Sequence, residues 1–128
     1  MNKKPERTGL ENPGTATRVV WGGEQVRHPY NATQPPIVAS AAYGYDDIDQ
    51  WYDVALGKAP GFIYSRMSNP TVQTLEAKLQ DLENAESAVA FSSGMAAISG
   101  VLYSFLRHGQ RVVSTKDSYG GTNKIFEE

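Results

Sequence analysis

Residues 92–97 (SSGMAA) constrain the fold more than any other feature, because they join two apolar runs. Residues 87–91 predict a short buried strand, and residues 95–107 predict a helix that is apolar on nearly every side. The first turn of such a helix has free N–H groups and the positive end of the helix dipole, which attract an anion. Gly94 lets the backbone approach that anion because it has no Cβ, and the hydroxyls of Ser92 and Ser93 can add donors. We therefore expect a phosphate-bearing ligand here, although a plain serine-capped turn has the same sequence signature.

A second strand is predicted over residues 111–115, which completes a strand–helix–strand unit of an α/β sheet. The two strands of such a unit are parallel, and ligands bind outside their carboxyl ends. Both residues 92–94 and residues 117–121 follow a predicted strand, so we expect these loops to converge. Tyr119 can stack on a planar cofactor or pack over the sheet edge. Gly109 is the expected C-cap of the helix between the strands.

The chain is expected to divide into an arm and the start of a domain. Residues 1–45 are rich in glycine and proline and predict an extended arm, with residues 17–21 either a short helix or an extended piece. Such an arm cannot bury itself, so it should lie on another surface, for example that of a second subunit. Residues 46–128 predict the incomplete start of an α/β domain, which opens with a helix over 46–56 capped by Asp46 or Asp47.

Residues 64–71 (YSRMSNPT) are a loop that leads into a second predicted helix, over residues 70–84. Asn69 is a good N-cap and Pro70 suits the first helical position. The apolar stripe of this helix consists of Val72, Leu75, Leu79 and Leu82. In the loop, the planar guanidinium of Arg66 can hold two phosphate oxygens, and Tyr64 can offer a hydroxyl beside it. A solvated arginine next to a packed tyrosine is the alternative interpretation.

Composition excludes several classes of function. The formal net charge is −2, which gives no basic surface for nucleic acid. Cysteine is absent and the two histidines, His28 and His108, lie far apart, so we expect no metal site. No apolar run reaches the roughly 20 residues of a membrane span, and the basic start of the chain lacks the apolar segment of a secretory signal. We expect a cytoplasmic protein without nucleic-acid or membrane partners.

Four segments together resemble the pyridoxal-phosphate-dependent enzymes of cysteine and methionine metabolism, the transsulfuration family. This family includes cystathionine γ-synthase, the cystathionine lyases, O-acetylhomoserine sulfhydrylase and methionine γ-lyase. The segments follow the family's order and similar spacing, and the resemblance covers nearly the whole chain from about residue 17 onward. They are residues 34–37 (QPPI), 64–71 (YSRMSNPT), 92–97 (SSGMAA) and 119–122 (YGGT).

The resemblance implies an α/β fold of the aspartate-aminotransferase-like type (pyridoxal-phosphate fold type I), with the arm and the first βαβ part of the cofactor domain. Pyridoxal 5'-phosphate is the implied cofactor, and Ser93, Gly94 and Met95 would bind its phosphate. Tyr119 would stack on the pyridine ring and assist proton transfer at the amine of a small amino-acid substrate, as a catalytic residue.

The family's active site is shared between subunits, which implies a homodimer or homotetramer. By the resemblance, Tyr64 and Arg66 would reach the cofactor phosphate of the neighbouring subunit. The family's cofactor-bearing lysine and the aspartate that pairs with the pyridinium nitrogen lie further along, and neither has a counterpart in these 128 residues. We therefore expect the amino-terminal segment of a larger lyase or transferase, inactive alone.

Two other functions fit the residues less completely. One is a non-catalytic fragment or pseudo-enzyme that contributes dimerisation and part of a phosphate site. The other is an unrelated α/β module that binds a nucleotide phosphate, which leaves residues 64–66 and Tyr119 unexplained.

The indications about substrate conflict. Ile63 is similar to the sulfhydrylase pattern, because cystathionine-using members tend to have an acidic residue there. Gly121 stands where methionine γ-lyases often have cysteine, whereas residues 119–124 (YGGTNK) resemble the cystathionine lyases. Cystathionine, an O-acylhomoserine and methionine are all candidate substrates, and β- and γ-chemistry are both open.

Overall fold

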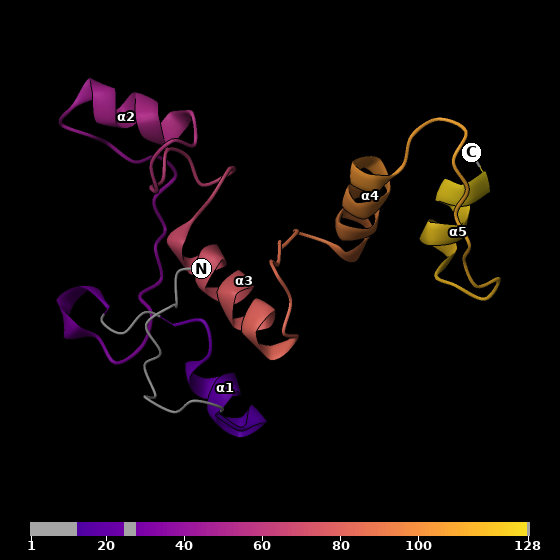
Figure 1. Cartoon of the computed structure of the whole chain (residues 1–128), viewed down its shortest axis with the longest axis horizontal. Coiled ribbons are helices and arrows are strands. Elements are labelled where there is room, and N and C mark those ends of the chain that lie inside the picture. The colour runs from indigo at the N-terminus through magenta and orange to yellow at the C-terminus, as the bar shows by residue number, and fades with distance from the viewer. Residues whose placement is uncertain (1–12, 25–27, 128) are drawn as a thin grey trace. The chain divides into compact units, whose positions relative to one another are not determined.

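A computed structural model describes residues 13–24 and 28–127, and these fall into two units, one up to Val89 and the other from Ala90. The elements are short helices joined by long connections (Figure 1). The first unit contains α1 (Thr15–Trp21), the 3-10 turn η1 (Pro29–Asn31), α2 (Ile48–Ala55) and α3 (Pro70–Leu82), and the second contains α4 (Gly94–Phe105) and α5 (Gly120–Glu127). None of the helices in the described ranges could cross a bilayer.

Helices α2 and α3 agree with the sequence prediction because both are specified by local signals. Asn69 caps α3 by accepting a hydrogen bond from the backbone N–H of Thr71 at 2.8 Å, and Pro70 occupies the first turn. Asp47 rather than Asp46 caps α2, accepting from the N–H of Asp49 at 2.9 Å. Gly57 follows α2 with a φ of +69°, as expected of a residue that ends a helix.

The two predicted strands are not formed in the described residues, and the βαβ prediction is wrong for this structure. Residues 87–91 and 111–115 are neither helix nor strand, and the one β-pairing between described residues is an isolated antiparallel bridge from Ala42 to Tyr64. Val89 is 70% exposed, so the burial predicted for residues 87–91 is also wrong, and Val113 in the other segment is 97% exposed. Parallel strands take their hydrogen bonds from neighbouring strands, and a pair alone is marginal in water.

Helix α4 starts where the sequence places it but is shorter and more exposed than predicted. Ser93 is its N-cap, and it ends at Phe105 with Leu106 as an extended C-cap. Gly109, the expected C-cap, instead has a φ of +85° in the turn after the helix. None of its residues is buried, and within its own unit α5 is the helix that contacts it. A helix that is apolar on every side needs more cover than one neighbour provides.

The arm is not extended throughout, because α1 forms within it and packs on α3. A helix of seven residues is too short to be stable alone, so its partner must hold it. Arg18 Nε donates to Asp81 Oδ2 at 3.1 Å, and Arg18 Nη2 donates to Asn84 Oδ1 at 2.9 Å. Gly23, with a φ of +70°, lies so close to Ala77 that a Cβ there would overlap its backbone.

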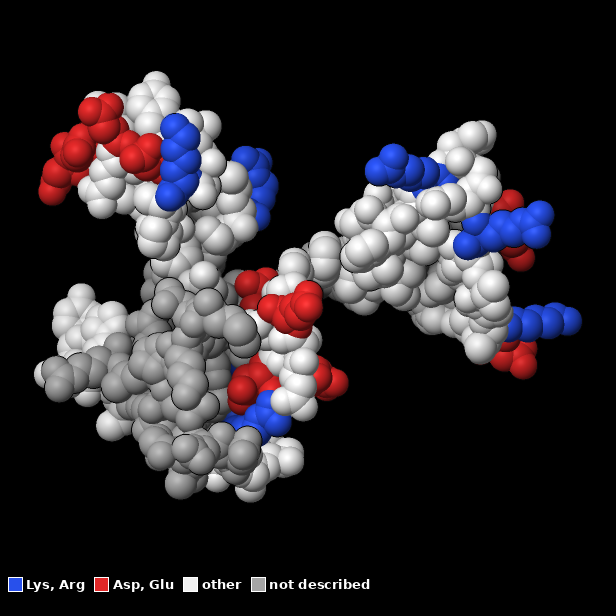
Figure 2. Space-filling view, in the orientation of Figure 1, with Lys and Arg blue, Asp and Glu red and all other residues white. Residues whose placement is uncertain are grey.

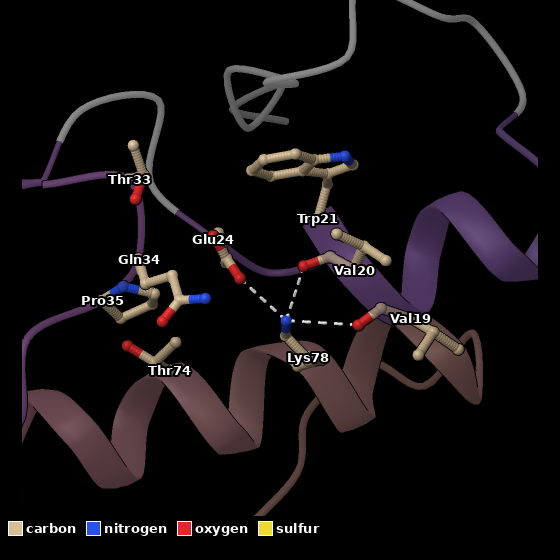
Figure 3. Close-up of a pocket in the computed structure, with 9 residues that line it drawn as sticks. All are labelled: Val19, Val20, Trp21, Glu24, Thr33, Gln34, Pro35, Thr74 and Lys78. Carbon is tan, nitrogen blue, oxygen red and sulfur yellow. Dashed lines mark hydrogen bonds and ion pairs between the residues drawn. The ribbon is translucent and has the colours of Figure 1, made fainter.

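Lys78 of α3 also contacts the end of α1 (Figure 3). Its ammonium donates to the carbonyl oxygens of Val19 at 3.3 Å and Val20 at 2.8 Å, and to Glu24 Oε1 at 2.8 Å. Glu24 also lies 3.4 Å from Nε2 of His28. Since the carbonyls belong to the end of α1, Lys78 stabilises the negative end of its dipole. The ammonium lies beside an open pocket of about 460 Å³.

The residues that are buried in the described part of the chain are polar rather than apolar. His28, Asn69 and Thr122 are 7%, 8% and 9% exposed, and no apolar residue within the described ranges is buried. Hydrogen bonds and tight backbone approaches therefore position the parts of each unit.

Candidate functional site

The first turn of α4 has the form of an anion cradle. Ser93 Oγ accepts from the N–H of Ala96 at 3.1 Å, which leaves the hydroxyl hydrogen available to a ligand. The N–H groups of Gly94 and Met95 make no backbone hydrogen bond within the described part of the chain. A Cβ built on Gly94 would meet no atom within 4 Å. The donors and the space therefore fit a phosphate group.

The start of α5 lies against the start of α4. Thr122, which is 9% exposed, directs Oγ1 at Met95 Sδ at 3.8 Å. A Cβ built on Gly121 would lie 2.8 Å from Cε1 of Tyr119 and 3.2 Å from Met95 Sδ. Tyr119 is 72% exposed. The predicted residues Ser93, Met95 and Tyr119 thus gather at one place, and we call Ser93, Gly94, Met95 and Tyr119 the cradle cluster.

Asn123 shapes the loop that presents Tyr119, and sequence reasoning missed it. Its side-chain amide donates to the carbonyl oxygens of Lys116 at 3.3 Å and Ser118 at 3.4 Å, and its Oδ1 accepts from the Ser118 hydroxyl. Thr122, also missed, joins the two helices. The sequence signal for both roles is the position of an asparagine and a threonine in the first turn of a helix. Such side chains often form hydrogen bonds to nearby backbone groups.

Tyr64 and Arg66 lie in the other unit, on a tight turn. The N–H of Met67 donates to the carbonyl of Tyr64 at 2.9 Å, so the backbone turns here rather than extending. The guanidinium carbon of Arg66 nevertheless lies 5.2 Å from the centre of the Tyr64 ring, within the range of a cation–π contact. Both side chains are exposed. The structure brings these two predicted residues together, and we call residues 64–67 the arginine turn.

A network around Asn69 ties the arginine turn to the arm. The Asn69 Nδ2 donates to Val38 O at 3.0 Å, Ser65 Oγ at 3.0 Å and Tyr43 Oη at 3.2 Å. Thr71 completes it, because Thr71 Oγ1 accepts from the N–H of Val38 at 2.8 Å. The sequence pattern predicts Asn69 as a helix cap alone. No local sequence pattern indicates its hydrogen bonds to distant residues.

The remaining charged groups do not suggest another site. Acidic side chains gather at α2, which makes that surface unfavourable for an anion (Figure 2); they are Asp46, Asp47, Asp49 and Asp53. No group of three or more His, Asp or Glu side chains within the described ranges could hold a metal ion. The cradle cluster and the arginine turn are therefore the candidates for ligand binding.

Comparison with known proteins identifies close relatives over most of the chain. Residues 16–128 match the family model described as Cys/Met metabolism PLP-dependent enzyme. The chain is 38% identical over 124 residues to a cystathionine gamma-synthase of Mycobacterium tuberculosis, covering 96% of this chain and 30% of the relative. It is 36% identical over 110 residues to an L-methionine gamma-lyase of Pseudomonas putida, covering 86% of this chain and 28% of the relative.

A solved structure extends the likeness to the fold. A putative O-acetylhomoserine (thiol)-lyase of Campylobacter jejuni, which carries N'-pyridoxyl-lysine-5'-monophosphate, matches with a TM-score of 0.81 and 29% identity, over 89% of this chain and 28% of that one. The predicted α/β, aspartate-aminotransferase-like fold class is thereby confirmed at the level of the family, for its amino-terminal part. The chain spans about 30% or less of the length of these relatives.

Proposed function

Because the chain belongs to the family of pyridoxal-phosphate-dependent enzymes of cysteine and methionine metabolism, we propose that it supplies part of a lyase or transferase acting on a sulfur amino acid. Pyridoxal 5'-phosphate is the cofactor of this family. The candidate reactions are elimination or replacement at the γ-carbon of cystathionine, an O-acylhomoserine or methionine. The relatives include enzymes of all these kinds, so they do not choose between them.

The cradle cluster is the proposed place of the cofactor. Its phosphate would accept hydrogen bonds from the N–H groups of Gly94 and Met95 and from the hydroxyl of Ser93. Tyr119 would stack its ring on the pyridine and hold a proton at its phenolic oxygen near the substrate amine. When bound, pyridoxal phosphate supplies an electron sink for carbanions formed from the amino acid.

One observation carries this proposal: Met95 and Tyr119, separated by 24 positions in the numbering, meet around Gly121. A phosphate cradle and an exposed aromatic ring are thereby presented side by side. That pairing suits a ligand with an anionic tail and a flat ring better than it suits inorganic phosphate alone.

The arginine turn is the proposed contribution of a neighbouring subunit. Its exposed guanidinium can form a bidentate pair with phosphate oxygens. In this proposal the chain self-associates as a dimer or tetramer, and each complete site takes its cradle cluster from one copy and its arginine turn from another. A cytoplasmic location is part of the same proposal.

Binding of pyridoxamine 5'-phosphate to the 128-residue chain tests the cradle cluster. This form of the cofactor is chosen because its amine cannot condense with surface lysines. We expect it to bind at least about tenfold more tightly than pyridoxamine, because two or three charge-assisted hydrogen bonds are at stake. Gly94→Ala should remove that preference, since the added methyl group stands where the phosphate approaches. Gly44→Ala, at another glycine with no atom within 4 Å of a built Cβ, is the matched control.

Equal binding of the two compounds, or an unchanged preference in Gly94→Ala, would contradict the proposed phosphate site. A nucleoside diphosphate that binds as tightly as pyridoxamine phosphate would favour a nucleotide module instead.

Mixing two defective chains tests whether sites are shared. Gly94→Ala and Arg66→Met each damage every site of their own homodimer. In a mixed dimer, one of the two sites combines an intact cradle cluster with an intact arginine turn. Random pairing at equal concentration therefore restores about a quarter of the tight sites. No recovery on mixing would place both groups in one chain or remove Arg66 from the site.

A further inference from the structure

We infer that Asn69 is a positioning residue: its side-chain amide holds the arginine turn and so orients Tyr64 and Arg66. The inference rests on the proposed function, in which these two side chains reach the cofactor phosphate. Asn69 itself is 8% exposed, and in this inference it acts through the turn and not on the ligand.

The amide nitrogen of Asn69 is the centre of the network. Its two hydrogens face three acceptors, namely Val38 O at 3.0 Å, Ser65 Oγ at 3.0 Å and Tyr43 Oη at 3.2 Å. A buried amide with this many partners is costly to disturb, because each acceptor left without a donor loses a part-buried hydrogen bond.

Ser65 transmits the effect of Asn69 to the turn. It stands between Tyr64 and Arg66, and its hydroxyl accepts from Asn69 while donating to the carbonyl of Ser40. Its backbone N–H donates to Ala41 O at 2.8 Å. Both the side chain and the backbone of Ser65 are therefore fixed, which restricts the directions that its two neighbours can take.

The oxygen and the nitrogen of the Asn69 amide have separate roles, so a substitution can change one and keep the other. Oδ1 caps α3 by accepting from the N–H of Thr71, whereas Nδ2 holds the arginine turn. Asn69→Asp keeps a capping oxygen and replaces the donor by an acceptor. Asn69→Ser also keeps a good cap and adds no charge. Agreement between the two variants excludes the new negative charge as the cause of an effect.

The first experiment measures the order of the turn without any ligand. In the 128-residue chain, we expect both Asn69 variants to raise the rate of trypsin cleavage after Arg66, and of hydrogen exchange at the Ser65 N–H, by about tenfold. Exchange in α3 should stay at the wild-type rate because its cap is retained. Asp47→Asn is the matched control: it makes the reverse exchange, carboxylate to amide, at the N-cap of α2 and should leave the turn unchanged. Wild-type cleavage and exchange in both Asn69 variants would overturn the inference.

The second experiment separates this inference from the proposed function. Affinity for pyridoxamine 5'-phosphate and for pyridoxamine is measured in Arg66→Met and in both Asn69 variants. We expect all three to lose affinity for the phosphate form and to keep their affinity for pyridoxamine. An unchanged phosphate preference in Arg66→Met would remove Arg66 from the proposed site, whatever Asn69 does. A turn that opens in the Asn69 variants without loss of phosphate preference, while Arg66→Met loses it, would overturn the positioning role.

Discussion

The hydroxyl of Thr122 lies 3.8 Å from the sulfur of Met95, and this contact joins the first turns of α4 and α5. The two residues are 27 positions apart in the chain, and Thr122 is one of three described residues that are buried. The starts of two helices are thereby held side by side, and the proposed cofactor site depends on that pairing.

Thr122→Val should separate packing from hydrogen bonding at this contact. Valine has nearly the same shape but no hydroxyl, and sulfur is a weak acceptor, so we expect a loss of no more than about 1 kcal/mol in the association of α4 with α5. Met95→Ala removes the partner altogether and should cost more. Hydrogen exchange of the α5 amides measures both, and a larger effect of Thr122→Val than of Met95→Ala would contradict this assignment.

Gly121→Ala should displace the ring of Tyr119. The new Cβ would lie 2.8 Å from Cε1 of that ring, which is exposed and can rotate away. The expected result is a changed near-ultraviolet tyrosine signal and weaker binding of pyridoxamine phosphate, with helix content preserved. Gly120→Ala is the control, since a Cβ there meets nothing within 4 Å. If the two variants behaved alike, steric displacement of the ring would not be the cause.

Gly23→Ala should detach α1 from α3. The residue has a φ of +70°, and its Cβ would overlap the backbone of Ala77. Gly57→Ala, at a φ of +69° with nothing within 4 Å, has the conformational penalty alone, about 1 to 2 kcal/mol. We expect the protection of the α1 amides against hydrogen exchange to be lost in Gly23→Ala. Intact protection would show that the backbone can move aside.

Lys78→Met should weaken the same contact by another route. Three acceptors lose a charged donor, and Glu24, whose side chain is 7% exposed, loses one of its charged neighbours. We expect the docked population of α1 to fall by about tenfold or more. Lys58→Met, at an exposed lysine, should change it by less than about twofold. Nuclear magnetic resonance shifts of the α1 amides report the docked fraction.

Local signals in the sequence predicted what is locally determined. Asn69 and Pro70 placed the start of α3 at the correct residue, because a cap and a fixed φ act within one turn. The start of the next helix was predicted at Met95, one residue after the observed start of α4 at Gly94. The ends were predicted less well: the C-cap assigned to Gly109 lies three residues beyond the observed Leu106.

Features that depend on distant partners were missed or wrong. Residues 87–91 and 111–115 have the composition of strands, but a strand also requires neighbours that hydrogen-bond to it. The same limit applies to Asn69, whose bonds to Val38 and Tyr43 span 31 and 26 positions. The residues of the candidate site, and the approach of the loops before α4 and α5, could be predicted from the sequence. The hydrogen-bond network of Asn69 that holds the arginine turn is evident only in the structure.

The uncovered valines at 112 and 113 have a consequence for handling the protein. Val113 is almost wholly exposed, on a segment of β-favouring residues that nothing shields in the described part of the chain. Stretches of this kind tend to stack between molecules. Concentrated samples of the isolated chain are therefore expected to form fibrils that bind thioflavin T, and a lysine at position 113 should slow their growth.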